Sequence, residues 1–433
     1  MRSLGTRSFV LLGTVLLFTG CEGDSEDTEQ KPTVHRGLIS ADETWRASDN
    51  PHVVRGMVLV TGATKPVLTV EAGVEVRFEN GAGLLIGDAL EGPGELRAEG
   101  TSTAPILMTA DSDAPKPGDW LGLAIQGQAS GTSRLAHVTI EYAGGIPAVE
   151  GEGEALLRAT AAGLRVLVTD YESAPPRSLQ VEDVTVRKSE HHGVLMMGAG
   201  LTSDSHRLSS VDNAGVALKV TANEVGTLPW DSTVQGNTIN ALHVISGDVI
   251  TTQTWPDLGV PYQVASIFGE GPYFLRVGSA ASPTLTLRPG TELRMPAESF
   301  IMVGFDEGEG NIVPGTLKAQ GTGPAPIRFV PATATATKGY WSGLFFNGPS
   351  GSALDYVTVT HGGRLLYGVL GGGNVNVYSE LGSFMTHSRV SDSAGCGVVS
   401  RPAQGALPDL TQPTLGNDFA GNEGEAQCNG DVP

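Results

Sequence analysis

The stretch LTVEAGVEVRFENGAGLLIGD, residues 68–88, shows the pattern from which the fold can be inferred. Apolar residues occupy alternate positions in three short runs, and the runs are followed by the turn pairs Ala72-Gly73, Asn80-Gly81 and Gly87-Asp88. Alternation over a few residues is typical of a half-buried β-strand. Strands this short need neighbours, and these turns leave no room for a helical crossover. We therefore expect coils of short parallel strands with polar side chains directed outward.

The same pattern occurs twice, in the same order. The paired segments are LTVEAG (68–73) with LTLRPG (285–290), GTSTAPILM (100–108) with GTGPAPIRF (321–329), GDWLGLAI (118–125) with GYWSGLFF (339–346), and LAHVTIEYAG (135–144) with LDYVTVTHGG (354–363). Trp45 and Trp255 form a further pair upstream. Such repetition indicates a solenoid, because each unit exposes apolar edges that only the next unit covers. We predict an all-β, right-handed parallel β-helix with two related halves in tandem, 37–246 and 247–433.

One segment comes close to a helical pattern. Residues 155–168 have some apolar residues at helical spacing, but Gly163 and the β-branched Val166 and Val168 weaken the pattern. We expect an insertion or an irregular turn there.

The N-terminus has the composition of an export signal. Arg2 and Arg7 precede the apolar run 9–18, which is too short to span a bilayer. Cys21 follows Gly20 directly, and this arrangement resembles the signal of bacterial lipoproteins, in which the cysteine is lipidated. Phe18 departs from that family's pattern, which prefers leucine at this place. An ordinary secretory peptide with an incidental cysteine is the alternative.

The resemblance also implies a cellular location. Residues 1–20 would be a signal peptide, and a lipidated Cys21 would attach the protein to a membrane of the bacterial cell envelope, expected to be the outer membrane. The domain would then face either the periplasm or the cell surface. Residues 21–36 are rich in acids and small residues, so we expect a flexible tether.

The charge of the chain restricts its partners. Without Arg2 and Arg7, 25 of the 27 lysines and arginines remain against 47 acids, which gives a net charge of −22. This balance works against binding to nucleic acid and is compatible with neutral glycans, cations or basic proteins. It leaves the oligomeric state open.

Two cysteines remain once Cys21 is lipidated. Cys396 and Cys428 are an even pair in an exported protein, a setting in which disulfides form and persist. We expect a disulfide that caps the C-terminal end of the solenoid. Two free thiols are the alternative.

The architectural motifs as a group resemble a known class of protein. The runs 180–196 and 384–399 each end in polar residues, a glycine and two apolar residues, and NDFAGN at 417–422 has the form of a turn between rungs. With the repeated segments above, they resemble the right-handed parallel β-helix lipoproteins and surface proteins of bacterial envelopes. The resemblance covers residues 37–425. It implies a fold and says little about activity.

The best candidate for a metal site is a group of three acids, Asp111, Asp113 and Asp119. Carboxylates are ligands that Ca²⁺ prefers, so these residues could hold that ion. The second copy reads PATATATKGYW at 331–341 and has no acid there, which favours a solvated loop. We expect no other cofactor, and we assign no catalytic residue.

Two other features attract attention. His191 and His192 are adjacent, and neighbouring side chains of a strand point to opposite faces, so we expect a turn rather than a metal or catalytic site. Trp120 and Trp341 have apolar neighbours, which favours anchors in the core over platforms for sugars.

The function expected from these observations is binding. We predict a lipid-anchored envelope protein whose acidic faces contact a glycan, a matrix component or another envelope protein, with ligand-binding residues that the sequence does not identify. A carbohydrate-active enzyme, either a polysaccharide lyase or a glycoside hydrolase, is the alternative. It would need acids and a base that converge on one face.

Overall fold

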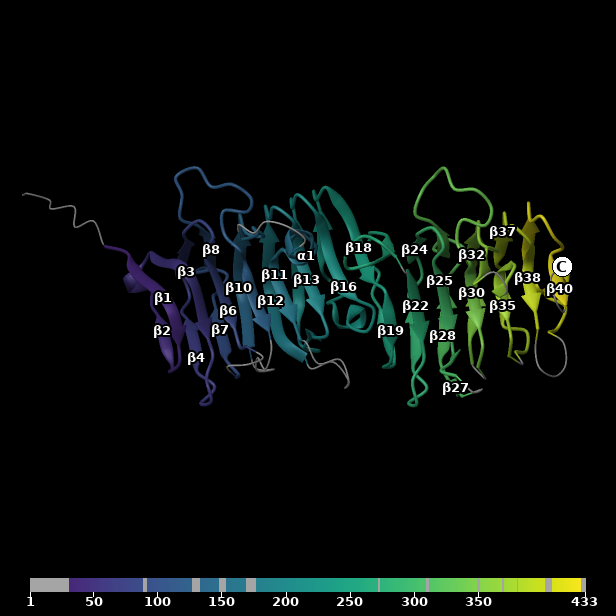
Figure 1. The fold of residues 1–433 in the computed structure, drawn as a ribbon, viewed down its shortest axis with the longest axis horizontal. Coiled ribbons are helices and arrows are strands. Elements are labelled where there is room, and N and C mark those ends of the chain that lie inside the picture. Colours follow the sequence, from purple (N-terminus) through teal and green to yellow (C-terminus); the bar gives the residue numbers. More distant parts are fainter. Residues whose placement is uncertain are drawn as a thin grey trace, which may run out of the picture. The chain divides into compact units, whose positions relative to one another are not determined.

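The computed structural model describes residues 31–88, 92–126, 133–147, 153–168, 177–271, 273–308, 311–348, 351–367, 370–379, 381–401 and 407–429. From Pro32 onward these residues form a right-handed parallel β-helix (Figure 1). The predicted fold class is therefore confirmed. Each coil adds one short strand to each of three columns, and the strands of a column pair in parallel with those of the next coil.

The first half contains columns I, II and III. Column I consists of β2 (Glu43–Trp45), β4 (Val67–Val70), β7 (Glu95–Glu99), the first parts of β10 (Ser133–Glu141) and β12 (Arg177–Arg187), and β14 (Gly200–Leu201). Column II consists of the first parts of β1 (Thr33–Ile39) and β3 (His52–Val60), β5 (Glu75–Phe78), β8 (Ile106–Ala110), the second parts of β10 and β12, β15 (His206–Val211) and β17 (Thr233–Gln235). Column III consists of the second parts of β1 and β3, β6 (Gly83–Ile86), β9 (Leu123–Gln126), β11 (Ala162–Leu167), β13 (His192–Met197), β16 (Val216–Thr221) and β18 (Ile239–Ile245).

The second half contains columns I′, II′ and III′. Column I′ consists of β20 (Gln253–Trp255), β23 (Thr284–Leu287), β28 (Thr316–Gln320), β31 (Ala353–Asp355) and β36 (Met385–Thr386). Column II′ consists of β21 (Tyr262–Ala265), β24 (Glu292–Met295), β29 (Ile327–Pro331), β32 (Val357–Thr360), β37 (Arg389–Ser391) and β39 (Asp418–Ala420). Column III′ consists of β19 (Gly247–Val249), β22 (Phe274–Val277), β25 (Phe300–Val303), β30 (Gly343–Phe346), β35 (Gly373–Val377), β38 (Cys396–Ser400) and β40 (Gln427–Asn429).

Two short hairpins, one α-helix and three 3-10 turns lie between the strands of the coils in the described residues. The antiparallel hairpins are β26 (Phe305–Asp306) with β27 (Ile312–Val313) and β33 (Leu365–Leu366) with β34 (Leu370–Gly371). The helical elements are α1 (Gly153–Thr160) and the 3-10 turns η1 (Ala47–Asp49), η2 (Val225–Thr227) and η3 (Pro413–Leu415). Helix α1 and the hairpin β33–β34 occur at equivalent places in the two copies. Helix α1 follows segment 135–144, and the hairpin follows the counterpart of that segment, 354–363.

The interior is one cluster of buried apolar residues that extends from Ile39 to Leu410. It forms because inward residues of successive strands stack at the spacing between strands, about 4.8 Å. Leu68 of β4, for example, pairs in register with Leu96 of β7, and both side chains are fully buried. The outward neighbour Arg97 keeps about half of its side chain exposed and pairs with a carboxylate.

The paired tryptophans anchor this core. Trp120 Nε1 donates to the carbonyl of Glu141 at 2.9 Å, and Trp341 Nε1 donates to the carbonyl of Thr360 at 2.7 Å. Both side chains are fully buried. The expectation that Trp120 and Trp341 pack in the interior is confirmed, and neither ring is available to stack on a sugar.

The two sets of columns do not continue one to one. β18 pairs with β16 of column III along one edge and with β21 of column II′ along the other. Column II ends at β17, whose second edge pairs with no strand in the described part of the chain. η2 and β20 lie against each other, and the chain forms three strands between them, β17, β18 and β19. An ordinary coil has only two strands between successive positions of one column, such as β5 and β6 between β4 and β7. The halves are therefore joined with a slip of one column.

The helix α1 corrects the expectation for residues 155–168. The segment is not an irregular turn, because it contains most of α1 and then all of β11. Gly163 lies in β11 and so does not interrupt the helix. An ion pair of 2.7 Å between Arg158 and Glu154, four residues apart, supports α1. The sequence pattern was weak because it covered two elements with different periods.

The C-terminal disulfide is present. Cys396 of β38 and Cys428 of β40 are bonded across neighbouring strands of column III′, with their Cα atoms 6.1 Å apart. The predicted cross-link at the end of the solenoid is confirmed. Cys21, by contrast, lies outside the described residues, so its lipidation stays a prediction. Within the part of the chain that is described, no helix is long and apolar enough to cross a membrane.

Candidate functional site

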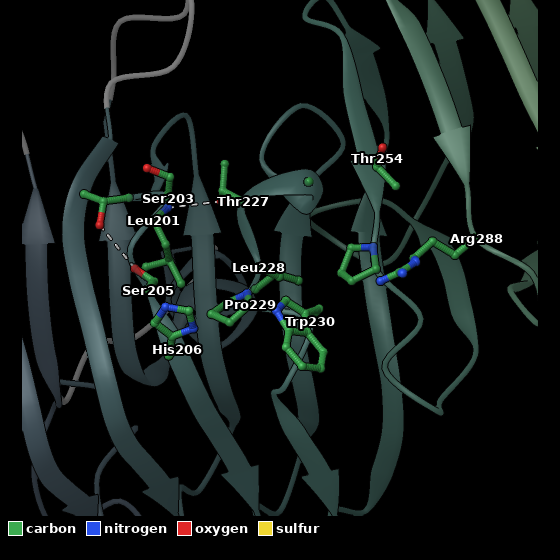
Figure 2. A pocket seen from close by; sticks show the side chains of 13 residues that line it. Leu201, Ser203, Ser205, His206, Thr227, Leu228, Pro229, Trp230, Thr254 and Arg288 are labelled. Atoms are coloured by element: carbon green, nitrogen blue, oxygen red, sulfur yellow. Dashed lines mark hydrogen bonds between the residues drawn. The ribbon is translucent and has the colours of Figure 1, made fainter.

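A pocket of about 340 Å³ lies at the junction of the two halves (Figure 2). Its wall comes from the segments 201–206 and 226–230 of the first half and from Thr254, Pro256 and Arg288 of the second. Its volume falls within the range of about 300–1,000 Å³ that small-ligand sites have. We call it the junction pocket.

The column slip explains why the pocket exists. Most of the wall residues lie in β14, η2 and β20 or shortly after them, and Arg288 directly follows β23. They therefore lie at the corner that follows the strands of columns I and I′. In an ordinary coil this corner leads into a strand of column II that the next coil covers. No strand pairs with the free edge of β17 in the described chain, and β21 lies on column III instead. The corner is therefore left open to solvent.

Trp230 is the most exposed tryptophan of the protein. Its exposed fraction is 67 %, whereas the other four tryptophans, Trp45, Trp120, Trp255 and Trp341, are fully buried. The turn that carries it is braced by Ser232 Oγ, which donates to the carbonyl of Pro229 at 2.7 Å. An indole held in this way offers a flat apolar face beside a polar pocket. Such a surface suits the apolar face of a sugar ring.

A histidine and an arginine stand on the two sides of this ring. In Figure 2, Trp230 lies between His206 and Arg288. The guanidinium of Arg288 has no ion pair and no hydrogen bond within the described residues, whereas Arg207 and Arg294 on outer rows are paired with carboxylates. An unpaired cation beside an aromatic face can bind a negatively charged group without first losing a partner.

The floor of the pocket is fixed by a buried turn. Thr227 Oγ1 donates to the carbonyl of Glu224 at 2.7 Å and accepts from the backbone N–H of Leu201 at 3.1 Å. The Glu224 side chain is 3 % exposed, and this burial raises its pKa to about 7. Thr221 Oγ1 donates to its carboxyl group. These bonds link two successive coils below the pocket.

The lining chemistry does not fit glycoside hydrolysis. The described wall offers an indole, a guanidinium, an imidazole and several hydroxyl groups, and it contains no carboxylate. Asp204, Asp231 and Asp257 are each adjacent in sequence to a lining residue but do not line the pocket themselves. Asp231 accepts from the backbone N–H of Arg207 at 2.9 Å and lies 3.7 Å from His206. Glycoside hydrolysis uses two carboxyl groups on either side of the bond, and this wall does not present such a pair.

The three acids considered as a candidate calcium site do not converge in the fold. Asp119 accepts from the backbone N–H of Lys116 at 2.8 Å and so closes its own turn. Asp111 and Asp113 lie on the exposed part of the same loop. The ligand atoms of these three residues do not come within 4.8 Å of one another. Calcium binding, which the sequence favoured less than a solvated loop, has no geometric support there.

Another group does bring potential metal ligands together. Among the described residues, His137, Glu182 and Asp183 have ligand atoms within 4.8 Å of one another. Both acids are already engaged, because Arg134 lies 2.5 Å from Glu182 and Arg207 lies 2.5 Å from Asp183. The hydrogen bond from Arg207 lowers the pKa of Asp183. A cation would have to displace two guanidinium groups, so the group is an ion-pair network.

His191 and His192 separate as expected. His191 Nδ1 donates to the carbonyl of Gly144 at 2.9 Å. Burial at the start of β13 lowers the pKa of His192 to about 3, which keeps it neutral. The two rings belong to no group of metal-ligating atoms in the described chain.

Sequence reasoning missed Trp230, although a signal was present. Four of the five tryptophans are paired between the two copies, and Trp230 is the one without a counterpart. A tryptophan that occurs in only one of the two copies is not required by the fold that they share, so it is a candidate for a functional role. Arg288 gives a similar signal, since it stands where the first copy has Glu71.

Comparison with known proteins supports the fold. Residues 37–149 match the family model of a pectate-lyase-like β-helix domain. Comparison with curated proteins and with solved structures finds no match. The matched residues lie in the first half and contain no residue of the junction pocket.

Proposed function

We propose that the protein is a lipid-anchored β-helix of the bacterial cell envelope that binds a glycan in the junction pocket without cleaving it. The observation that carries this proposal is the exposed ring of Trp230 beside a pocket of ligand size. Lipidation of Cys21 would hold the domain at the membrane surface. The likeness of residues 37–149 to a pectate-lyase-like domain supports a carbohydrate as the ligand.

The charge of Arg288 indicates which class of glycan the junction pocket would bind. Its guanidinium is unpaired within the described residues, in a protein with a net charge of −20. A neutral ligand would leave this cation without a partner. We therefore propose that the bound glycan carries a carboxylate or sulfate group that meets Arg288 while a sugar ring stacks on Trp230.

The test uses the full-length protein in detergent and a panel of acidic and neutral glycans. Replacement of Trp230 by alanine should weaken binding of the preferred glycan at least roughly tenfold, because the stacking surface is lost. Binding is measured by calorimetry, and quenching by acrylamide follows Trp230 selectively, since the other tryptophans are fully buried. The bound glycan should protect this fluorescence from quenching.

The matched control is Phe268→Ala, which removes an exposed ring that lies outside the pocket wall. This variant should bind as the parent does. Equal affinity of the Trp230 variant and the parent would show that the glycan does not bind in the junction pocket. Detection of reducing sugars or unsaturated products in the same samples would show that the protein cleaves the glycan, which would contradict the proposal.

A further inference from the structure

A second pocket, of about 570 Å³, lies on the outer side of column III′. Its wall includes Tyr273, Glu298, Phe300, Arg364, Leu366 and Tyr367. No residue of this wall belongs to the junction pocket. We call it the column III′ pocket.

The two copies of the repeat provide an internal comparison for this wall. The backbone N–H of Gly81 donates to the carbonyl of Asp119 at 2.8 Å, and the N–H of Glu298 donates to the carbonyl of Tyr340 at 2.9 Å. Asp119 and Tyr340 directly precede the paired tryptophans. Glu298 therefore occupies the position that glycine holds in the first copy.

Arg364 shows the same replacement. The N–H of Gly145 donates to the carbonyl of Trp120 at 2.9 Å, and the N–H of Arg364 donates to the carbonyl of Trp341 at 3.2 Å. These equivalent bonds place Arg364 where the first copy again has glycine.

The aromatic residues of the wall complete the set. β6 begins at Gly83 and β25 begins at Phe300, and these strands pair with Met57 and Phe274 in the preceding coil. Gly56 and Tyr273 are the residues just before Met57 and Phe274. The wall residues Tyr273, Glu298, Phe300 and Arg364 thus stand where the first copy has Gly56, Gly81, Gly83 and Gly145. The first copy shows that the coil closes without these four side chains.

One of these replacements strains the backbone. Gly81 has a φ of 72°, and Glu298 adopts a φ of 62°. This left-handed conformation costs an L-residue free energy that glycine does not lose. The carboxylate of Glu298 lies 2.7 Å from Arg364, but 67 % and 50 % of the two side chains are exposed. An ion pair this exposed contributes little to stability, so it does not account for the strained residue.

The chemistry of the wall selects a ligand. Phe300 and Leu366 are the largely buried apolar floor, and Tyr367 stands at the edge with 80 % of its surface exposed. Glu298 and Arg364 offer an acceptor and several donors while their charges cancel. A flat apolar face with hydroxyl groups at its edge fits this combination. We propose that the column III′ pocket binds a pyranose ring of a neutral saccharide.

This pocket would give the protein a second attachment point, independent of the junction pocket and with a different charge preference. Arg288 in the junction pocket has no carboxylate partner in the described chain, whereas Arg364 in this pocket has one. An apolar peptide side chain or a lipid tail would pack against the floor of Phe300 and Leu366. It would offer no hydroxyl groups to the Glu298 carboxylate and the Arg364 guanidinium. The rim therefore favours a saccharide over a purely apolar partner.

The decisive variant is Glu298→Gly, which restores the residue of the first copy. It should keep the melting temperature of the parent or raise it, because glycine relieves the strained φ. It should also weaken binding of a neutral oligosaccharide roughly tenfold, since a charged acceptor is lost. The probes are hexasaccharides of β-1,4-glucan, β-1,4-xylan, α-1,4-glucan and chitin, and saturation-transfer NMR on the full-length protein reads out contact.

Two further variants sharpen the test. Tyr367→Ala removes an exposed ring and should abolish the saturation transfer to the sugar, whereas Phe268→Ala, an exposed ring outside the pocket wall, should preserve it. Binding that survives in both the Glu298 and Tyr367 variants would overturn the proposal. It would equally be overturned if none of the four probes bound, and an apolar dye whose binding required Tyr367 would then identify an apolar partner instead.

Discussion

Burial shifts the pKa of a few ionisable side chains. Burial raises the pKa of Glu224 to about 7, and it lowers the pKa of His192 to about 3 and that of His243 to about 4. Lys219 donates to the carbonyls of Ala159 in α1 and Ile267 in a loop, at 3.0 and 2.8 Å. The Lys219 ammonium group thus joins α1 to that loop.

Glu224 should make the protein less stable as the pH rises. Between pH 4.5 and about 7 the folded protein holds a proton on Glu224 that the unfolded chain releases. The stabilisation is therefore complete below pH 4.5 and is lost as the pH rises through 7. We expect the loss to reach at most about 3 kcal/mol. Urea unfolding of the parent and of Glu224→Gln across this range measures it.

The variant supplies its own control. Subtraction of the two pH profiles removes the contributions of His192 and His243, whose lowered pKa values make stability rise with pH over part of the same range. Parallel profiles for variant and parent would show that Glu224 titrates in the folded state as it does in the unfolded chain.

At the scale of elements, the corners between strands are held by buried amide side chains. Asn213 Oδ1 accepts from the backbone N–H of Ser189 at 3.0 Å, and its Nδ2 donates to Asn237 Oδ1 at 2.8 Å. Asn422 accepts from the N–H of Ser393 at 3.0 Å and so repeats the arrangement in the second half. Each amide satisfies backbone groups that a sharp corner would leave unpaired in the interior.

The last strands depend on the disulfide in addition. The bond between Cys396 and Cys428 closes a loop of 32 residues, which stabilises the folded chain by about 3–4 kcal/mol in the chain-entropy model. Reduction should therefore speed hydrogen exchange in β38 and β40. Strand β4, in the other half, serves as the internal control and should exchange as before. Unchanged protection of β38 and β40 after reduction would show that packing alone holds this end.

At the scale of the whole molecule, the halves are joined by the pairing of β18 with both β16 and β21. The junction pocket takes its wall from both halves, so it exists only where they meet. Repeat proteins commonly vary their loops to create binding sites. Here the column slip itself leaves the corner open.

The membrane attachment of the whole protein should depend on Cys21. Its replacement by serine removes the acceptor thiol, and we expect the variant to leave the membrane fraction, because no described helix is long and apolar enough to cross a membrane. Fractionation with a detergent-partition step measures this. Thr28→Ala, which changes the tether but keeps Cys21, should remain attached. A serine variant that stays in the detergent phase would disprove the lipid anchor.

The sequence by itself determined the kind of strand, the order of the copies and the disulfide. Alternating residues such as Leu68 and Val70 define an inward face locally, and glycine or asparagine at a corner permits the turn. These signals act within a few residues, so they can be recognised along the chain. The burial of Trp120 and Trp341 followed from the same local pattern.

Only the tertiary structure decided where the columns slip and which side chains meet. Alternation shows that β18 has an inward face, but it does not state which strands lie along its two edges, because pairing joins residues far apart in the sequence. The exposure of Trp230 and the convergence of Glu298 and Arg364 depend on that pairing. Both pockets therefore arise from long-range register, whereas the coil arises from local pattern.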